Sequence, residues 1–212
     1  MCLDSGLFDG NEFPTVPGVG NLRNFVTYGE FFSSDSERGV DTAMIRPIVK
    51  YPAPGLEELC APVKDFNSDL KELAGDMLET MYSAPGIGLA APQVGVNIRL
   101  IVVDVTAGQE DGHQLVLVNP EVTEHSGRQK EEEGCLSLPG LTASVERPSW
   151  VRVKAQDLDG NEFEIEGEEL VARVLCHEID HLEGILYLDR LSPLRRDLLR
   201  RKIKKLIRAG EW

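Results

Sequence analysis

The 212-residue sequence lacks several features that mark whole classes of protein. It has no apolar run that approaches the roughly 20 residues of a membrane-spanning helix. Only four cysteines are present, and the chain has no apolar signal-peptide core, which argues against the disulfide framework of a secreted protein. Positive charge is scarce, because 36 Asp and Glu outnumber 22 Lys and Arg, and this disfavours a general nucleic-acid coat. We therefore expect a soluble, cytoplasmic protein that does not enter a membrane.

The composition is otherwise that of an ordinary globular protein. With 42% apolar and 27% charged residues, the chain can form one domain with a substantial core. Residues 1–43 differ, because they show no sustained period of two or 3.6 and carry seven acids against two arginines. Their acidity argues against a transit peptide. We expect them to be either a disordered N-terminal extension or an upstream start that the cell does not use.

Apolar spacing predicts one helix and several short strands in the middle of the chain. The helix runs from about Asn67 to Ser83, with Asn or Ser as its cap and Pro85-Gly86 as its stop. Short runs rich in β-branched residues, separated by Gly, Asn and Asp turns, predict strands at 98–105, 114–118, 121–125, 150–156 and 163–165. These runs favour antiparallel strands.

The segment His177-Glu178-Ile179-Asp180-His181 is the most informative in the sequence. On a helix, this spacing puts both imidazoles on one face, where they can bind a single metal ion. Glu178 then stands where it can move a proton of a water molecule, so the pattern indicates a metal-dependent hydrolase. Two bound histidines need at least a third protein ligand, and its identity separates the classes of enzyme.

The helix that carries this motif is predicted to be buried on two sides. It begins near Glu168-Glu169, and Gly184 lies just past its end. Leu170 and Val174 share one stripe with the two histidines, while Glu178 lies on a second apolar stripe. The residues left for the polar face are Arg173, Asp180 and Glu183.

Two further segments resemble known motifs. They are Gly86-Ile87-Gly88-Leu89-Ala90-Ala91-Pro92-Gln93 and Glu133-Gly134-Cys135-Leu136-Ser137. Together with the histidine segment, they resemble the three motifs of the peptide deformylases, G-x-G-L-A-A-x-Q, E-G-C-L-S and H-E-x-x-D-H, in the same order. The resemblance extends over roughly Met44 to Arg208. It implies an α+β fold in which antiparallel strands surround a buried central helix that carries the metal motif.

The resemblance also implies a function and a set of site residues. The reaction is hydrolytic removal of the N-formyl group from the N-terminal methionine of newly made polypeptides, with release of formate. The implied metal ligands are Cys135, His177 and His181, and the implied working ion is Fe(II), although Zn, Ni or Co also suit this donor set. The implied catalytic residues are Glu178 as general acid and base, with Gln93 and the backbone N–H of Leu136 holding the carbonyl oxygen.

Substrate contacts are expected on both sides of the metal. Glycine at positions 86 and 88 permits close approach of a peptide chain, which adds as an extra strand against this loop. We expect an apolar methionine pocket lined in part by the metal helix. The expected substrate-binding residues are Gly86, Ile87, Gly88, Leu89, Gly134, Leu170 and Val174.

Plainer interpretations compete with each of these assignments. The histidines could be ordinary helix residues, but two on an apolar stripe would leave buried donors unsatisfied. Cys135 alone would be a small buried residue, and only its motif favours a ligand. Cys176 departs from the family, which commonly has Gln there, and we interpret it as a tolerated neighbour. The alternative functions are a small metallopeptidase and an inactive ribosome-associated binding module.

The C-terminal stretch carries the positive charge of the chain. From Arg190 to Arg208 there are nine Lys or Arg and only Asp197 on the acidic side. We expect residues 44–191 to form the catalytic metallohydrolase domain and residues 192–212 a basic helix packed on it or projecting from it. This helix either only docks on the domain or contacts ribosomal RNA through Arg195 to Arg208. We expect a monomer that acts on nascent formyl-methionyl polypeptides.

Overall fold

The computed structural model describes residue 1, residues 43–110 and residues 112–212. The expectation that residues 1–43 are disordered or unused therefore falls almost wholly outside the described residues. The helices are α2 (Ser68–Ser83), α3 (Glu169–Leu182) and α4 (Pro193–Ala209), with 3-10 turns η1 (Pro54–Glu57), η2 (Ala91–Val94) and η3 (Tyr187–Arg190). The strands are β1 (Gly88–Ala90), β2 (Leu100–Val103), β3 (Leu115–Ser126), β4 (Gln129–Cys135), β5 (Leu138–Arg147), β6 (Trp150–Gln156) and β7 (Glu162–Glu168).

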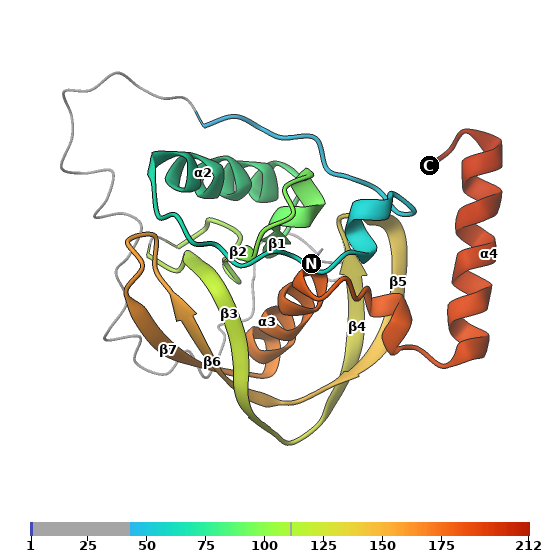
Figure 1. The fold of residues 1–212 in the computed structure, drawn as a ribbon. Coiled ribbons are helices and arrows are strands. Elements are labelled where there is room, and N and C mark those ends of the chain that lie inside the picture. The colour runs from blue at the N-terminus through green and yellow to red at the C-terminus, as the bar shows by residue number, and fades with distance from the viewer. Residues whose placement is uncertain (2–42, 111) are drawn as a thin grey trace.

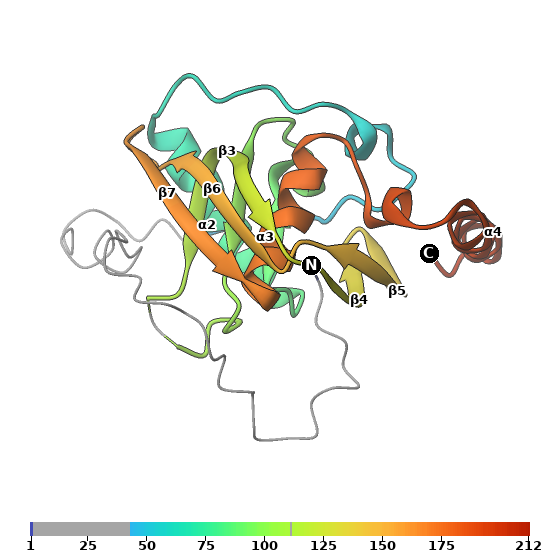
Figure 2. The ribbon, with the colours of Figure 1, turned by 90° about the horizontal axis from the view of Figure 1, so that it is seen from below.

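The strands form two antiparallel units around α3. One is a five-stranded sheet in the order β1-β2-β3-β6-β7, and the other is the β4–β5 hairpin. Figures 1 and 2 show α3 enclosed between the sheet and the hairpin. Helix α2 lies on the opposite face of the sheet, and α4 lies apart at the edge of the molecule. The predicted α+β fold with a buried central helix is confirmed.

Burial on both faces of β2 explains how the layers are joined. All four residues of β2 are buried. Ile101 and Val103 belong to the apolar core that includes α3, whereas Leu100 and Val102 belong to the core that includes α2. Such a continuous apolar run is expected of a strand that is covered on both faces. The strand therefore places α2 and α3 on opposite sides of the sheet.

The predicted helices have the expected ends. The side chain of Asn67 accepts a hydrogen bond from the backbone N–H of Leu70 at 3.0 Å, which caps α2. Gly184 follows α3 with a φ of +69°, a left-handed conformation that favours glycine at a helix end. Among the described residues, no helix is long and apolar enough to cross a membrane.

The strand predictions were right for β6, too long for β2 and too short for β7. The runs 114–118 and 121–125 belong to one strand, β3, whose register against β6 shifts between Val118 and Glu121. Asn119, with a φ of +51°, lies in this irregular stretch. The hairpin strands β4 and β5 were missed, because β4 reads Gln-Lys-Glu-Glu-Glu and its first residues show no apolar alternation. Its structure comes from pairing with β5 along its whole length.

Candidate active site

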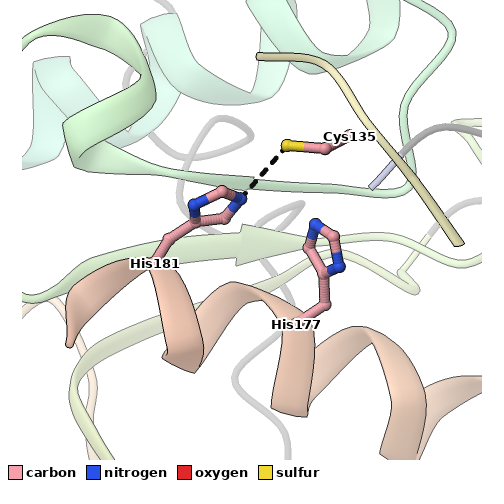
Figure 3. A group of neighbouring side chains, drawn as sticks. All are labelled: Cys135, His177 and His181. Carbon is pink, nitrogen blue, oxygen red and sulfur yellow. Dashed lines mark hydrogen bonds between the residues drawn. The ribbon is translucent and has the colours of Figure 1, made fainter. Parts of the chain in front are cut away.

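Three possible metal ligands meet between α3 and the end of β4. His177 and His181 project from one face of α3 and are almost fully buried, and Cys135 is the last residue of β4. One ligand atom from each of the three lies within 4.8 Å of the others. Figure 3 shows the three side chains facing one another, with Cys135 Sγ 3.3 Å from His181 Nε2. The structure therefore brings together residues that lie more than 40 positions apart in the sequence.

The donor atoms of this cluster fit a divalent transition metal. Within the described part of the chain, His177 Nε2 and His181 Nδ1 are buried and have no hydrogen-bond partner. Buried polar atoms normally have partners, so Nε2 of His177 calls for a ligand. The His181 nitrogen that faces the cluster is Nε2, which lies 3.3 Å from Cys135 Sγ. Burial, followed by the charge of His177, holds the pKa of His181 well below its usual value, which keeps its ring neutral as metal binding requires. One thiolate with two imidazoles suits Fe(II) or Zn.

The orientation of His177 is set by a buried carboxylate. Its Nδ1 lies 2.8 Å from Oε2 of Glu133, a residue of β4 with no exposed surface. The Arg147 guanidinium on β5 donates to both carboxylate oxygens of Glu133, at 2.9 and 3.0 Å. A histidine whose second nitrogen is held in this way presents the other nitrogen in a fixed direction. Here that nitrogen is Nε2, the unpartnered atom of the cluster.

Asp180 corrects the sequence prediction for the polar face of α3. We expected it to face solvent with Arg173 and Glu183, yet it is 7% exposed. The Arg147 guanidinium donates to Asp180 from one side and that of Arg190, on η3, donates from the other. The two cations cover the carboxylate, so a position that is polar by helical spacing becomes buried by tertiary contacts.

Burial of Glu133 has an electrostatic consequence. Burial alone would raise the pKa of its carboxyl, but hydrogen bonds from His177 and Arg147 outweigh that effect and lower the pKa to about 2. The same contacts raise the pKa of Arg147 despite its burial. Glu133 and Arg147 are therefore charged at neutral pH, and they form a fixed support behind the histidine.

Glu178 lies beside the cluster on α3 and is fully buried. Its Oε1 accepts a hydrogen bond from the N-terminal ammonium of Met1 at 2.6 Å, while its Oε2 has no hydrogen-bond partner in the described part of the chain. A Cβ at Gly88 would lie 2.5 Å from Glu178 Oε1, so the second glycine of the Gly86–Gln93 segment is required for space. The β1 backbone and this carboxylate are thus in direct contact.

Gln93 is held so that its amide nitrogen faces the cluster. Its Oε1 accepts a hydrogen bond from the N–H of Ala90 at 2.9 Å. Its Nε2 lies 3.2 Å from Ser137 Oγ and 3.5 Å from Cys135 Sγ. Leu136 follows Cys135 directly in the chain, and the role of its N–H stays a prediction. The side-chain amide of Gln93 therefore directs its N–H groups toward the cluster of Cys135, His177 and His181.

The residues predicted for substrate binding lie around the same space. Ile87 and Leu89 are fully buried, and Gly134 pairs with Thr142 next to Cys135. Val174 is buried in the core cluster that contains Met1 and Ile87, and Leu170 packs against this cluster while staying partly exposed. Their role as a methionine pocket stays a prediction.

Sequence reasoning missed the buried ion pairs and Met1. Glu133 opens the Glu-Gly-Cys-Leu-Ser segment, so its acidic side chain within a chemical motif was a usable signal. Arg147 and Arg190 carry no such signal, because only the fold brings them to α3. Cys176 is partly buried on α3 outside the ligand cluster, and burial raises the pKa of its thiol to about 11. That Cys176 is a tolerated neighbour of the site stays a prediction.

Comparison with known proteins matches most of the chain to one family model and to its members. A family model described as polypeptide deformylase matches residues 45–197. A peptide deformylase of Acidobacterium capsulatum is 54% identical over 169 residues, which cover 80% of this chain and 99% of that protein. One from Thermodesulfovibrio yellowstonii is 51% identical over 160 residues, covering 76% of this chain and 97% of that protein.

Solved structures agree with the sequence matches. A peptide deformylase crystal structure from Legionella pneumophila superposes with a TM-score of 0.73 at 47% identity, covering 78% of this chain and 97% of the other. One from Thermus thermophilus gives a TM-score of 0.71 at 43% identity, covering 77% of this chain and 96% of the other. Both matches extend over nearly the whole of the solved chain.

Proposed function

The chain belongs to the polypeptide deformylase family, and from this premise we propose which of its residues perform the reaction. Enzymes of this family are metal-dependent hydrolases that remove formyl groups from nascent peptides. The chain therefore removes the N-formyl group from the N-terminal methionine of newly made polypeptides and releases formate. The metallopeptidase and inactive-module alternatives are not favoured.

The ligands that we propose for the ion are Cys135, His177 and His181. The observation that carries this proposal is the buried cluster itself, in which one ligand atom from each residue lies within 4.8 Å of the others and His177 Nε2 has no partner in the described part of the chain. We propose Fe(II) as the working ion, on the resemblance to the family, since a thiolate with two imidazoles accepts Fe(II) as well as Zn, Ni or Co. When bound, a divalent ion polarises a carbonyl and lowers the pKa of water toward ~7.

Glu178 is the proposed proton carrier. Hydrolysis of a formamide needs a proton removed from the attacking water and a proton delivered to the leaving nitrogen. One oxygen of Glu178, Oε2, has no hydrogen-bond partner in the described chain, and the other lies 2.6 Å from an amine nitrogen. The carboxylate can therefore accept the proton from water and return it to the amine, so that formate and an N-terminal amine are formed.

Gln93 and Leu136 are the proposed donors to the carbonyl oxygen. This oxygen gains negative charge as the formyl carbon becomes tetrahedral, and a donor placed in advance stabilises it by ~3 kcal/mol. The Gln93 amide is held by Ala90 and directs its N–H groups toward Cys135 Sγ. The backbone N–H that follows Cys135 is the second proposed donor.

Substrate recognition is proposed to combine backbone pairing with one apolar pocket. The N–H of Ile87 and the carbonyl of Gly88 offer a donor and an acceptor to a peptide that lies beside β1. Leu89, Gly86 and Gly134 flank this position, and Leu170 and Val174 of α3 are the proposed wall of the methionine pocket. Backbone pairing does not read side chains, so the enzyme should accept varied sequences after methionine.

A formate-release assay tests the proposed function. The substrate is formyl-Met-Ala-Ser, and the protein is loaded with Fe(II) under anaerobic conditions. Glu178→Gln should lower kcat by at least ~10²-fold, because it removes the proton carrier. Glu79→Gln, an exposed glutamate on α2, is the matched control and should leave kcat unchanged. Absence of formate with the loaded wild-type protein would overturn the assignment.

The basic helix α4 is proposed to contact ribosomal RNA. Its anchoring side is small: Ile203 is buried in the core cluster of the β4–β5 hairpin, and Leu199 packs against that cluster. Its cations Arg195, Arg201, Lys202, Lys204, Lys205 and Arg208 are all exposed. A cationic helix of this kind binds phosphates in a salt-dependent way, and binding near the peptide exit would bring the enzyme to its substrate.

We also propose a division of the chain and a place of action. Residues 44–191 form the catalytic unit, and residues 192–212 form the basic helix and its end. The protein is proposed to act as a monomer. Cys60 and Cys176 are free thiols, which supports the reducing cytoplasm, where nascent formyl-methionyl chains are made.

A further inference from the structure

The first residue of the chain lies inside the proposed active site. The side chain of Met1 is 2% exposed and belongs to the same core cluster as Ile87 and Val174. In both views of the ribbon, the N-terminus stands beside α3 (Figures 1 and 2). Residues on α3 and β1, far away in the sequence, therefore surround the start of the chain.

The backbone of Met1 makes polar contacts with α3 and with the segment that leads into β1. Its ammonium donates to Glu178 Oε1 at 2.6 Å and to the carbonyl oxygen of Gly88 at 2.8 Å. Its carbonyl oxygen accepts a hydrogen bond from the N–H of Ile87 at 3.1 Å. A buried ammonium needs such partners, since an isolated buried charge is costly. All three partners are groups that we propose for catalysis or peptide binding.

This position corresponds to a product of the proposed reaction. Hydrolysis leaves an N-terminal methionine whose amine has just received a proton from Glu178. Met1 presents that chemical group, a methionine ammonium, to that carboxylate. Its backbone also pairs with Ile87 and Gly88, where we place the peptide. A simple packing role would need only burial of the side chain, and it would not require the amine to meet the proton carrier.

We propose that Met1 is an intramolecular ligand of the active site and competes with substrate as a tethered product. This inference rests on the proposed function. Residues 2–42 join Met1 to the catalytic unit, so the local concentration of the competitor does not depend on the concentration of the protein. A chain that begins at Met1 should therefore be partly self-inhibited, and its KM for external formyl-methionyl peptides should be raised while kcat is unchanged.

The test compares chains that differ only in the first residue. The wild-type chain and Met1→Gly are both released from a cleavable N-terminal fusion, so that each begins with an unmodified amine. Met44→Gly is the matched control, because Met44 is 63% exposed. With Fe(II)-loaded protein and formyl-Met-Ala-Ser, Met1→Gly should lower KM roughly tenfold or more, as expected when a tethered competitor is removed. Wild type and Met44→Gly should share one higher KM.

A second measurement follows the amine itself and does not depend on turnover. The chain is treated at pH 7 with an amine-acylating ester, and acylation of the first residue is followed by mass spectrometry of its N-terminal peptide. The amine of wild type should react at least several-fold more slowly than that of Met1→Gly, and saturating Met-Ala-Ser should remove the difference. The slow rate should be the same at different protein concentrations.

The outcomes separate this inference from the proposed function. If all chains release formate with the same KM and their amines react equally fast, the inference is overturned and the proposed function stands. If no chain releases formate, the proposed function fails, and amine protection relieved by Met-Ala-Ser still supports the ligand contact. Equal acylation rates in that case overturn both.

Discussion

The charged residues behind His177 and those on α4 differ in burial, and they differ in what their charge does. Behind His177, the charged side chains of Glu133, Arg147 and Asp180 are buried and hold one another through hydrogen bonds of fixed direction. On α4, a larger number of cations stands exposed, with Ile203 as the only fully buried residue of that helix. Burial fixes the positions of these charged side chains, because each buried ion needs a partner at a set distance. Exposure leaves the charges of α4 available to a partner and sensitive to salt.

Removal of one buried cation should have the largest effect. Arg147→Ala leaves the buried Glu133 carboxylate without its arginine partner and removes one of the two cations that cover Asp180, so it should lower the free energy of unfolding by roughly 3–5 kcal/mol. Arg152→Ala is the matched control, since Arg152 pairs with Glu124 and Glu166 on the surface and its loss should change little. Urea unfolding of the three proteins measures both values. Equal destabilisation by the two variants would show that the buried charges contribute no more to stability than the surface charges do.

Acid should weaken the buried group in a defined window. The folded-state pKa of Glu133 is lowered from 4.5 to about 2, so its contribution to stability is complete above pH 4.5 and is lost as the pH falls toward 2. The stability difference between wild type and Glu133→Gln should therefore shrink between these two pH values. Unfolding curves at a series of pH values measure it. A difference that stays constant over this window would show that the carboxylate is not held as described.

The exposed group should affect stability least and ribosome binding most. Lys204→Glu with Lys205→Glu should leave formate release and the unfolding midpoint nearly unchanged, because both side chains are exposed. Co-sedimentation with ribosomes should weaken and lose part of its salt dependence. Lys50→Glu with Lys64→Glu, two exposed lysines outside α4, is the matched control. Unchanged co-sedimentation in the α4 variant at moderate salt would argue for a helix that only docks on the domain.

The sequence predicted the parts of the site that depend on local spacing. The bounds of α3 followed from its apolar stripes and from Gly184, and the positions of His177 and His181 on one face followed from the helical period. The burial of Asp180 could not be predicted, because the arginines that cover it come from β5 and η3. For the same reason the contact of Met1 with Glu178 has no local signal, since these residues meet only in the folded chain.

Cys135, His177 and His181 are the proposed ligands of the catalytic ion. X-ray absorption at the metal edge of the Fe(II)-loaded protein, prepared anaerobically, measures the ligand atoms directly. The spectrum should contain one sulfur ligand that is lost in Cys135→Ser and retained in Cys176→Ser, whose thiol lies next to His177 in the chain. A sulfur ligand that persists in Cys135→Ser, or disappears in Cys176→Ser, would contradict the proposed site.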